Sequence, residues 1–127
     1  MKKDCFVRIK RENDEMPEET SSGIYHNKNG KHYILLERGD RYILDEGTLS
    51  VRRNGIDLLF SMERPFSCLY PTDFGSLPLT FDQVLLSSNE REDGLRILLK
   101  YRMSQDGAVV GDSALTIDIT YNRPDPV

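Results

Sequence analysis

The sequence predicts an all-β protein, an antiparallel up-and-down β-barrel of about eight strands. Short runs with an apolar residue at every second position recur along the chain, and turn-forming Asn-Gly and Asp-Gly pairs separate several of them. No window combines the apolar spacing of an amphipathic helix with helix caps. Since nearly all connections are short enough for hairpins, the strands should form a meander that closes on itself and so avoids exposed edges.

The N-terminal part is expected to contain strands over residues 4–11, 23–27 and 31–38. Asn29-Gly30 lies between the last two and indicates a type I′ hairpin. Residues 33–36 are all apolar, which predicts burial on both faces of that strand. The acidic segment 12–22 lacks apolar rhythm and is expected to be a solvated connection. Residues 39–46 stay unassigned, because Tyr42-Ile43-Leu44 fits either an edge strand or a loop folded over the barrel mouth.

Further strands are expected over residues 48–53, 56–62, 66–70, from Leu77 onward, 95–103 and 115–121. The strongest hairpin signal is Asn54-Gly55, because both central residues of a type I′ turn need positive φ. A two-residue turn fixes the register of the two strands that flank it. Arg53 should therefore share the core face with the apolar residues of its strand, while Arg52 should pair with Asp57 on the other face.

Turns and bulges are predicted at the remaining breaks in the pattern. A hinge is expected at residues 71–75, and a two-residue turn at Asp106-Gly107. The apolar phase slips near Asp82-Gln83, and the last two strands need one extra residue, for which Gly111-Asp112 is the natural place. The tail at residues 122–127 holds two prolines and is expected to fray.

Composition limits the classes of function. The chain has 127 residues, enough for a single barrel domain over residues 1–127 with its own core. Cys5 and Cys68 are too few for a disulfide framework and fit a reducing cytosol, so a cytoplasmic protein without an export signal is expected. A net charge of -4 disfavours nucleic acid, and no apolar run is long enough for a membrane span.

Several short motifs extend over nearly the whole chain. They are Gly23 before Tyr25, Arg53-Asn54-Gly55, Tyr70 with Phe74-Gly75 and Leu77-x-Leu79, residues 97–103 around Tyr101, and Leu115-Thr116-Ile117. In this order and spacing the sequence resembles the YwiB-like family of uncharacterised bacterial β-barrel proteins, which are grouped with the calycin or lipocalin-like folds. It departs from that family between Leu36 and Gly47, where the segment is short and holds Glu37-Arg38 in place of an acidic pair. The resemblance implies a closed barrel and no established activity.

Three residues are candidates for ligand binding: Arg53, Tyr70 and Tyr101. An arginine on a core face must be paired with carboxylates or carbonyls, lie at the rim, or hold an anionic ligand. The two tyrosines carry a hydroxyl on an apolar face, where most such groups simply find a backbone partner. For all three, structural packing or pairing is the preferred interpretation over ligand binding.

No catalytic set, metal site or cofactor is expected. His26 and His32 flank the Asn29-Gly30 turn, but the predicted register turns them to opposite faces. The chain is therefore interpreted as a non-enzymatic interaction or structural module with a largely filled barrel and an unidentified protein partner. The alternative is a barrel that binds a small amphipathic or anionic molecule in its interior or mouth.

Overall fold

The computed structural model describes residues 2–12 and 18–121. In these residues the chain forms ten strands, without helices: β1 (Lys2–Arg11), β2 (Glu19–Lys28), β3 (Lys31–Leu36), β4 (Arg41–Asp45), β5 (Thr48–Arg53), β6 (Ile56–Ser61), β7 (Phe66–Thr72), β8 (Gly75–Arg91), β9 (Gly94–Gln105) and β10 (Ala108–Tyr121). They join in one antiparallel sheet with the order β6-β5-β4-β3-β2-β1-β10-β9-β8-β7. The all-β up-and-down prediction is confirmed, with ten strands instead of about eight.

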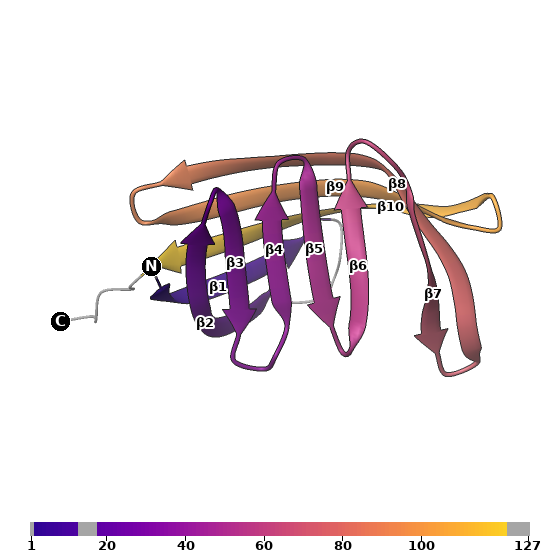
Figure 1. The fold of residues 1–127 in the computed structure, drawn as a ribbon. Coiled ribbons are helices and arrows are strands. Elements are labelled where there is room, and N and C mark those ends of the chain that lie inside the picture. Colours follow the sequence, from indigo (N-terminus) through magenta and orange to yellow (C-terminus); the bar gives the residue numbers. More distant parts are fainter. Residues whose placement is uncertain (1, 13–17, 122–127) are drawn as a thin grey trace.

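The barrel is nearly closed. The N- and C-terminal strands lie side by side within the sheet, and the two edges of the sheet are strands from the middle of the chain. The first and last strands pair, with Cys5 opposite Tyr121, so the N- and C-terminal parts share one ladder. The sheet order ends at β6 and β7, which follow each other in the chain but form no ladder within the described residues. Strands β2 to β6 form one layer, and β1, β10, β9 and β8 run across behind them (Figure 1). β7 and the first part of β8 extend to one side of these two layers.

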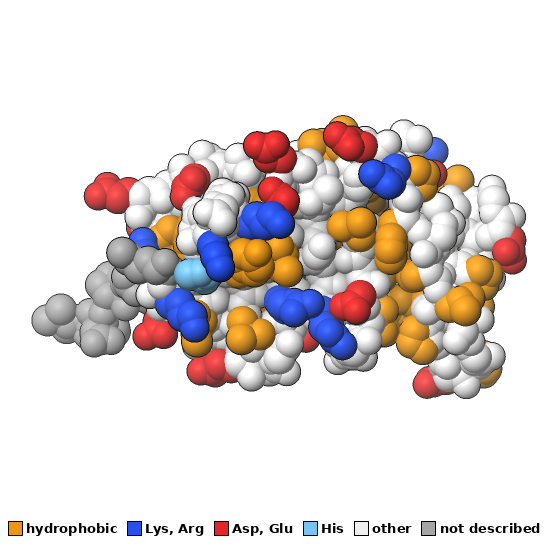
Figure 2. All heavy atoms as spheres, viewed as in Figure 1, with side chains coloured by type: hydrophobic (Ala, Val, Ile, Leu, Met, Phe, Trp, Pro, Cys, Tyr) orange, Lys and Arg blue, Asp and Glu red, His pale blue; other side chains and the backbone are white. Residues whose placement is uncertain are grey.

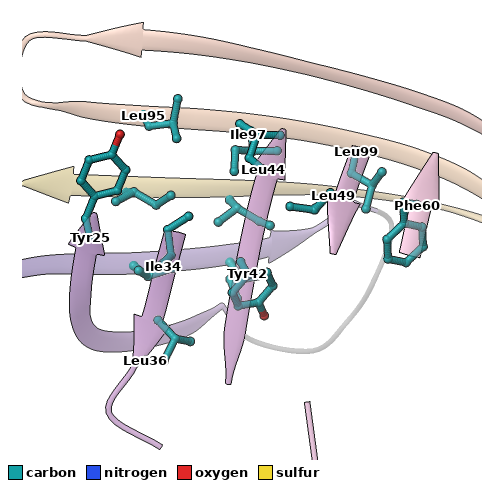
Figure 3. Packing of buried hydrophobic residues seen from close by; sticks show 14 of the residues in the cluster. Tyr25, Ile34, Leu36, Tyr42, Leu44, Leu49, Phe60, Leu95, Ile97 and Leu99 are labelled. Atoms are coloured by element: carbon teal, nitrogen blue, oxygen red, sulfur yellow. The ribbon is translucent and has the colours of Figure 1, made fainter. Parts of the chain in front are cut away.

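Apolar side chains fill the space between the two layers. Figure 3 shows Leu44 and Leu49 from the front layer pointing toward Ile97 and Leu99 of β9. The largest side chains with less than 2% exposure are Ile34, Leu36, Leu49, Leu95, Ile97, Leu99, Ile117, Ile119 and Val7. Each such burial stabilises the fold by about 1.5 to 3 kcal/mol, so this filled interior is the main source of stability.

All three predicted two-residue turns are confirmed. Asn29-Gly30, Asn54-Gly55 and Asp106-Gly107 have positive φ at both positions, as a type I′ turn requires. Around the second turn Arg53 lies opposite Ile56, and Arg52 lies opposite Asp57. The register that places Arg53 on the core face is therefore correct.

The bulge near Asp82-Gln83 is also confirmed. The register of β8 against β9 shifts between Asp82 and Leu85, and Gln83 has a φ of 51°. The second bulge was predicted at Gly111-Asp112 but lies between Val109 and Gly111. The prediction missed by one position because Ala108, Val109 and Val110 show no alternation that would mark the extra residue.

Other boundaries differ from the prediction. β2 begins at Glu19, inside the segment predicted as a connection, because Thr20 and its neighbours pair with β1. The segment 33–36 is not buried on both faces, since Leu35 is 49% exposed. The hinge at 71–75 is instead a tight turn between Thr72 and Gly75. The unassigned segment 39–46 contains β4, and the predicted frayed tail lies outside the described residues.

Candidate functional site

Arg53 lies at the end of β5, at the rim of the barrel, and carboxylates hold it there. Its Nη2 donates to Glu19 Oε1 at 2.7 Å, and its Nε lies 3.8 Å from Asp40 Oδ2. The side chain is 31% exposed. The expectation that an acidic side chain holds the guanidinium at the interior or rim is confirmed.

Arg38 completes a group of four charged residues, here called the charge cluster: Glu19, Arg38, Asp40 and Arg53. Arg38 donates to Asp40 Oδ2 at 2.7 Å and to Glu19 Oε2 at 3.0 Å. The two guanidinium groups therefore neutralise the two carboxylates, of which Asp40 is almost fully buried. This neutralised cluster connects the β3–β4 loop to the start of β2 and to the end of β5.

The charges in this cluster shift the ionisation of its members. The hydrogen bond from Arg53 lowers the pKa of Glu19 below its usual value, although burial acts in the other direction. The same hydrogen bond raises the pKa of Arg53. Burial raises the pKa of the Tyr42 hydroxyl beside the cluster. Glu19 is thus ionised at neutral pH and paired with both arginines.

The structure does not bring the three predicted site residues together. Tyr101 packs its ring against Phe60 and Phe81, with ring centroids 4.7 and 5.6 Å apart. Tyr70 lies on β7 opposite Leu77, partly buried against the core. Neither tyrosine contacts the charge cluster in the described residues, so Arg53, Tyr70 and Tyr101 form no common site.

A groove of about 880 Å³, here called the mouth groove, lies at one end of the barrel. Its walls come from residues 11–12 at the end of β1, 61–65 from the end of β6 onward, 82–85 at the β8 bulge, 100–102 of β9 and 112–114 of β10. Tyr101 lines it, whereas Arg53 and Tyr70 do not. The groove forms where β1 ends with a bond from Glu12 N to Ala114 O while β10 continues beyond it.

The mouth groove contains charges of both signs, and one buried carboxylate oxygen in it accepts no hydrogen bond from the described residues. Arg102 Nε donates to Asp112 Oδ1 at 2.9 Å. Asp82 lies opposite Arg102 in the ladder, but its Oδ1 is buried and accepts no hydrogen bond from residues 2–12 or 18–121. In the sequence Asp82 is recognisable only as part of a bulge, because a slip in the apolar alternation does not reveal which way a side chain points.

A second surface feature is the apolar end of the molecule at β7, β8 and the β9–β10 turn. Figure 2 shows hydrophobic side chains exposed over the part of this end formed by β6 to β8. Phe74 is 99% exposed at the β7–β8 turn and Leu69 is 70% exposed on β7. Val109 and Val110, beside the β9–β10 turn, are 58% and 55% exposed.

The histidines and cysteines form no reactive centre in the described part of the chain. His26 lies opposite Tyr33, and the Nδ1 of His32 hydrogen-bonds Tyr25, so the imidazoles diverge as predicted. No three His, Cys, Asp or Glu side chains among the described residues are grouped for a metal ion. Burial raises the pKa of Cys5 to about 11, and burial also raises the pKa of Cys68, so both are thiols at neutral pH.

Comparisons with known proteins agree with this architecture. A family model described as a domain of unknown function (DUF1934) matches residues 6–117. The crystal structure of the ywiB protein from Bacillus subtilis is similar with a TM-score of 0.72 and 23% identity, over 94% of this chain and 92% of that chain. No curated protein matches the chain. The resemblance noted from the sequence is thereby confirmed for the family and the nearly closed barrel, while the grouping with calycins stays a prediction.

Proposed function

We propose that this chain, which belongs to the DUF1934 family of domains of unknown function, is a non-enzymatic interaction module that works in the cytoplasm. The observation that carries the proposal is the filled interior. Leu49, Ile97 and Ile119 are 0% exposed at the middle of the two layers, where a barrel that binds a small molecule internally would need a cavity. Recognition is therefore assigned to the surface.

Three further observations support the proposal. The exposed side chains of Phe74 and Leu69 give one end of the molecule an apolar surface of the kind that partner proteins cover. Arg53, the strongest candidate anchor for an anion, is already paired with Glu19. The two cysteines, kept as thiols, fit the reducing cytoplasm and a role without a nucleophile.

A small amphipathic ligand in the mouth groove is the second candidate function. The groove volume of about 880 Å³ falls within the range of about 300 to 1,000 Å³ that is usual for small-molecule sites. Tyr101 offers a ring and a hydroxyl there. In this candidate function the bound species is a small molecule, whereas in the first it is a partner protein.

Two measurements separate these candidates. Native mass spectrometry of the freshly purified chain should show only the protein, and a retained small mass that is lost in Tyr101→Ala would favour the second candidate. A photo-crosslinking residue at Lys100, in the groove, should give a specific protein adduct in cells, while the same residue at Asp57 on β6, outside the groove, should not. Absence of any protein adduct from the groove and from a third probe at Leu69 would overturn the interaction module.

A further inference from the structure

Asp82 offers a buried oxygen that can accept a hydrogen bond. Its Oδ1 and the Tyr121 hydroxyl are the two buried side-chain polar atoms without a hydrogen-bond partner in the described residues. Tyr121 packs inside the barrel against Tyr25, whereas Asp82 lines the mouth groove. A carboxylate oxygen shielded from water without a donor is costly, and native proteins keep few such groups.

The neighbouring charges do not supply the missing donor. Lys100 and Arg64 line the same groove, but they are exposed and can be hydrated. Arg102 faces Asp82 across the ladder and interacts with its charge, but Arg102 Nε donates to Asp112 at 2.9 Å, and no donor among the described residues reaches Asp82 Oδ1. Asp82 Oδ1 is therefore a shielded acceptor, and a ligand group that satisfies it must bring a hydrogen-bond donor, of which a positively charged one binds a carboxylate most strongly.

The backbone holds Asp82 in this position. The β8 bulge places Gln83 at a φ of 51°, a conformation that costs free energy for a residue other than glycine. Bulges re-aim side chains and are frequent beside binding sites. The β9 segment opposite this bulge contains Tyr101, whose ring provides an apolar wall on which an alkyl stem can lie.

We infer that Asp82 binds a guanidinium or ammonium group on an apolar stem, an arginine or lysine side chain of an extended polypeptide partner. The inference rests on the proposed function, because that function supplies the polypeptide. A groove of about 880 Å³ exceeds the volume of one side chain and accommodates neighbouring residues of the same segment. The groove is lined by acidic and basic side chains in equal number, so the preference for a cation rests on Asp82 itself.

The test is a titration of the ¹⁵N-labelled chain followed by NMR. The probe is the peptide acetyl-Ala-Ala-Arg-Ala-Ala-amide, and its control carries citrulline, which has the same shape without the charge. We expect shifts at residues 82–85 and 100–102 with the arginine peptide and at least tenfold weaker binding of the citrulline peptide. Equal binding of both peptides, or no binding of either, would overturn the inference. Free arginine that binds as tightly as the peptide would overturn the assignment to a polypeptide.

Matched variants separate binding from stability. Asp82→Asn should lose binding of the arginine peptide at least tenfold and keep or raise the melting temperature, because Asp82 Oδ1 accepts no hydrogen bond from the described residues that the substitution would break. A lower melting temperature would mean that Asp82 is structural and would contradict the inference. Arg102→Gln should tighten binding, since it removes a competing cation, and Asp57→Asn on exposed β6 should change neither quantity.

These outcomes remain distinct from the test of the proposed function. A failed titration combined with a specific protein adduct from the Lys100 probe would remove the cationic ligand and leave the interaction module standing. Loss of adducts from all probe positions would remove the proposed function itself.

Discussion

At the scale of single residues, the charge cluster shows how a charged side chain can occupy a core face. Arg53 is tolerated beside apolar neighbours because Glu19 accepts its hydrogen bond at the rim. Glu19 also accepts from Arg38, so it keeps one partner when the other is removed. The two arginines therefore share the task of neutralising the carboxylates.

This sharing predicts a moderate effect of Arg53→Met. Loss of a hydrogen bond between charged groups costs about 1.5 to 3 kcal/mol, and partial exposure together with the remaining Arg38 should bring the loss to about 1 to 2 kcal/mol. Arg52→Ala removes only the exposed pair with Asp57 and should cost at most about 0.5 kcal/mol. Urea unfolding measures both, and equal midpoints would contradict the role assigned to Arg53.

The lowered pKa of Glu19 predicts a pH dependence. In the unfolded chain Glu19 has its usual pKa of 4.5, and in the folded chain its pKa is lower, so protonation favours unfolding. Its contribution to the free energy of unfolding is complete above pH 4.5 and is lost as the pH falls through the folded value. Glu19→Gln should therefore be less stable than the natural chain at pH 7, and the gap should narrow at pH 3. Urea unfolding at both pH values measures this difference in the free energy of unfolding. A difference that is the same at pH 7 and pH 3 would exclude the linkage to Glu19.

The orientation of Arg53 could be predicted from the sequence, but its partners could not. The Asn54-Gly55 turn fixes the register and hence the face, which is local information. Glu19 lies 34 residues away, and Asp40 lies in a segment whose structure the sequence left open. Asp82 was likewise visible only as a break in alternation. Side-chain partners depend on the folded arrangement of distant strands.

At the scale of the elements, the Asn54-Gly55 turn makes a direct prediction. Gly55 has a φ of 77°, which a β-branched residue adopts only with strain, so Gly55→Val should cost about 1 to 3 kcal/mol. The matched control is Gly111→Ala, because Gly111 lacks a positive φ and a Cβ there would meet nothing within 4 Å. Equal unfolding midpoints in urea would refute the type I′ turn.

Gly94 at the start of β9 is required for a different reason. A Cβ at this position would collide with the carbonyl oxygen of Ile119 in β10, while Tyr121 N donates to Asp93 O at 2.8 Å in the same turn. The backbones cannot separate without breaking this contact, so Gly94→Ala should destabilise the chain by more than about 2 kcal/mol. Thermal unfolding provides the measurement, and an unchanged melting temperature would refute the close approach.

Turns and alternating strands were predictable, and the long strands were predictable only in part. Two-residue turns need particular residues, so Asn-Gly and Asp-Gly identify them. β8 runs for 17 residues from Gly75 to Arg91, but its bulge changes which positions face the core. The sequence of β8 therefore shows two shorter runs of apolar alternation instead of one long strand. β4 has only five residues, too few for an apolar alternation to distinguish a strand from a loop.

At the scale of the whole molecule, β1 and β10 join the two halves of the barrel, and β6 and β7 form no ladder in the part of the chain that the structure describes. The short connections predict the meander. They do not predict that β6 and β7 are the edges of the sheet, because the closure of a barrel depends on how strongly each layer bends. The two layers meet over side chains such as Leu49 and Ile97, and the proposed recognition role is for this reason assigned to the end surfaces.

A crystal structure of the freshly purified chain tests the filled barrel and its surface role most directly. We expect continuous side-chain packing between Leu49 of β5 and Ile97 of β9, with no electron density for a foreign molecule between the layers. Any bound species should lie in the mouth groove beside Asp82 or on the apolar end around Phe74. Density for a small molecule inside the barrel, with the core side chains displaced around it, would contradict the account.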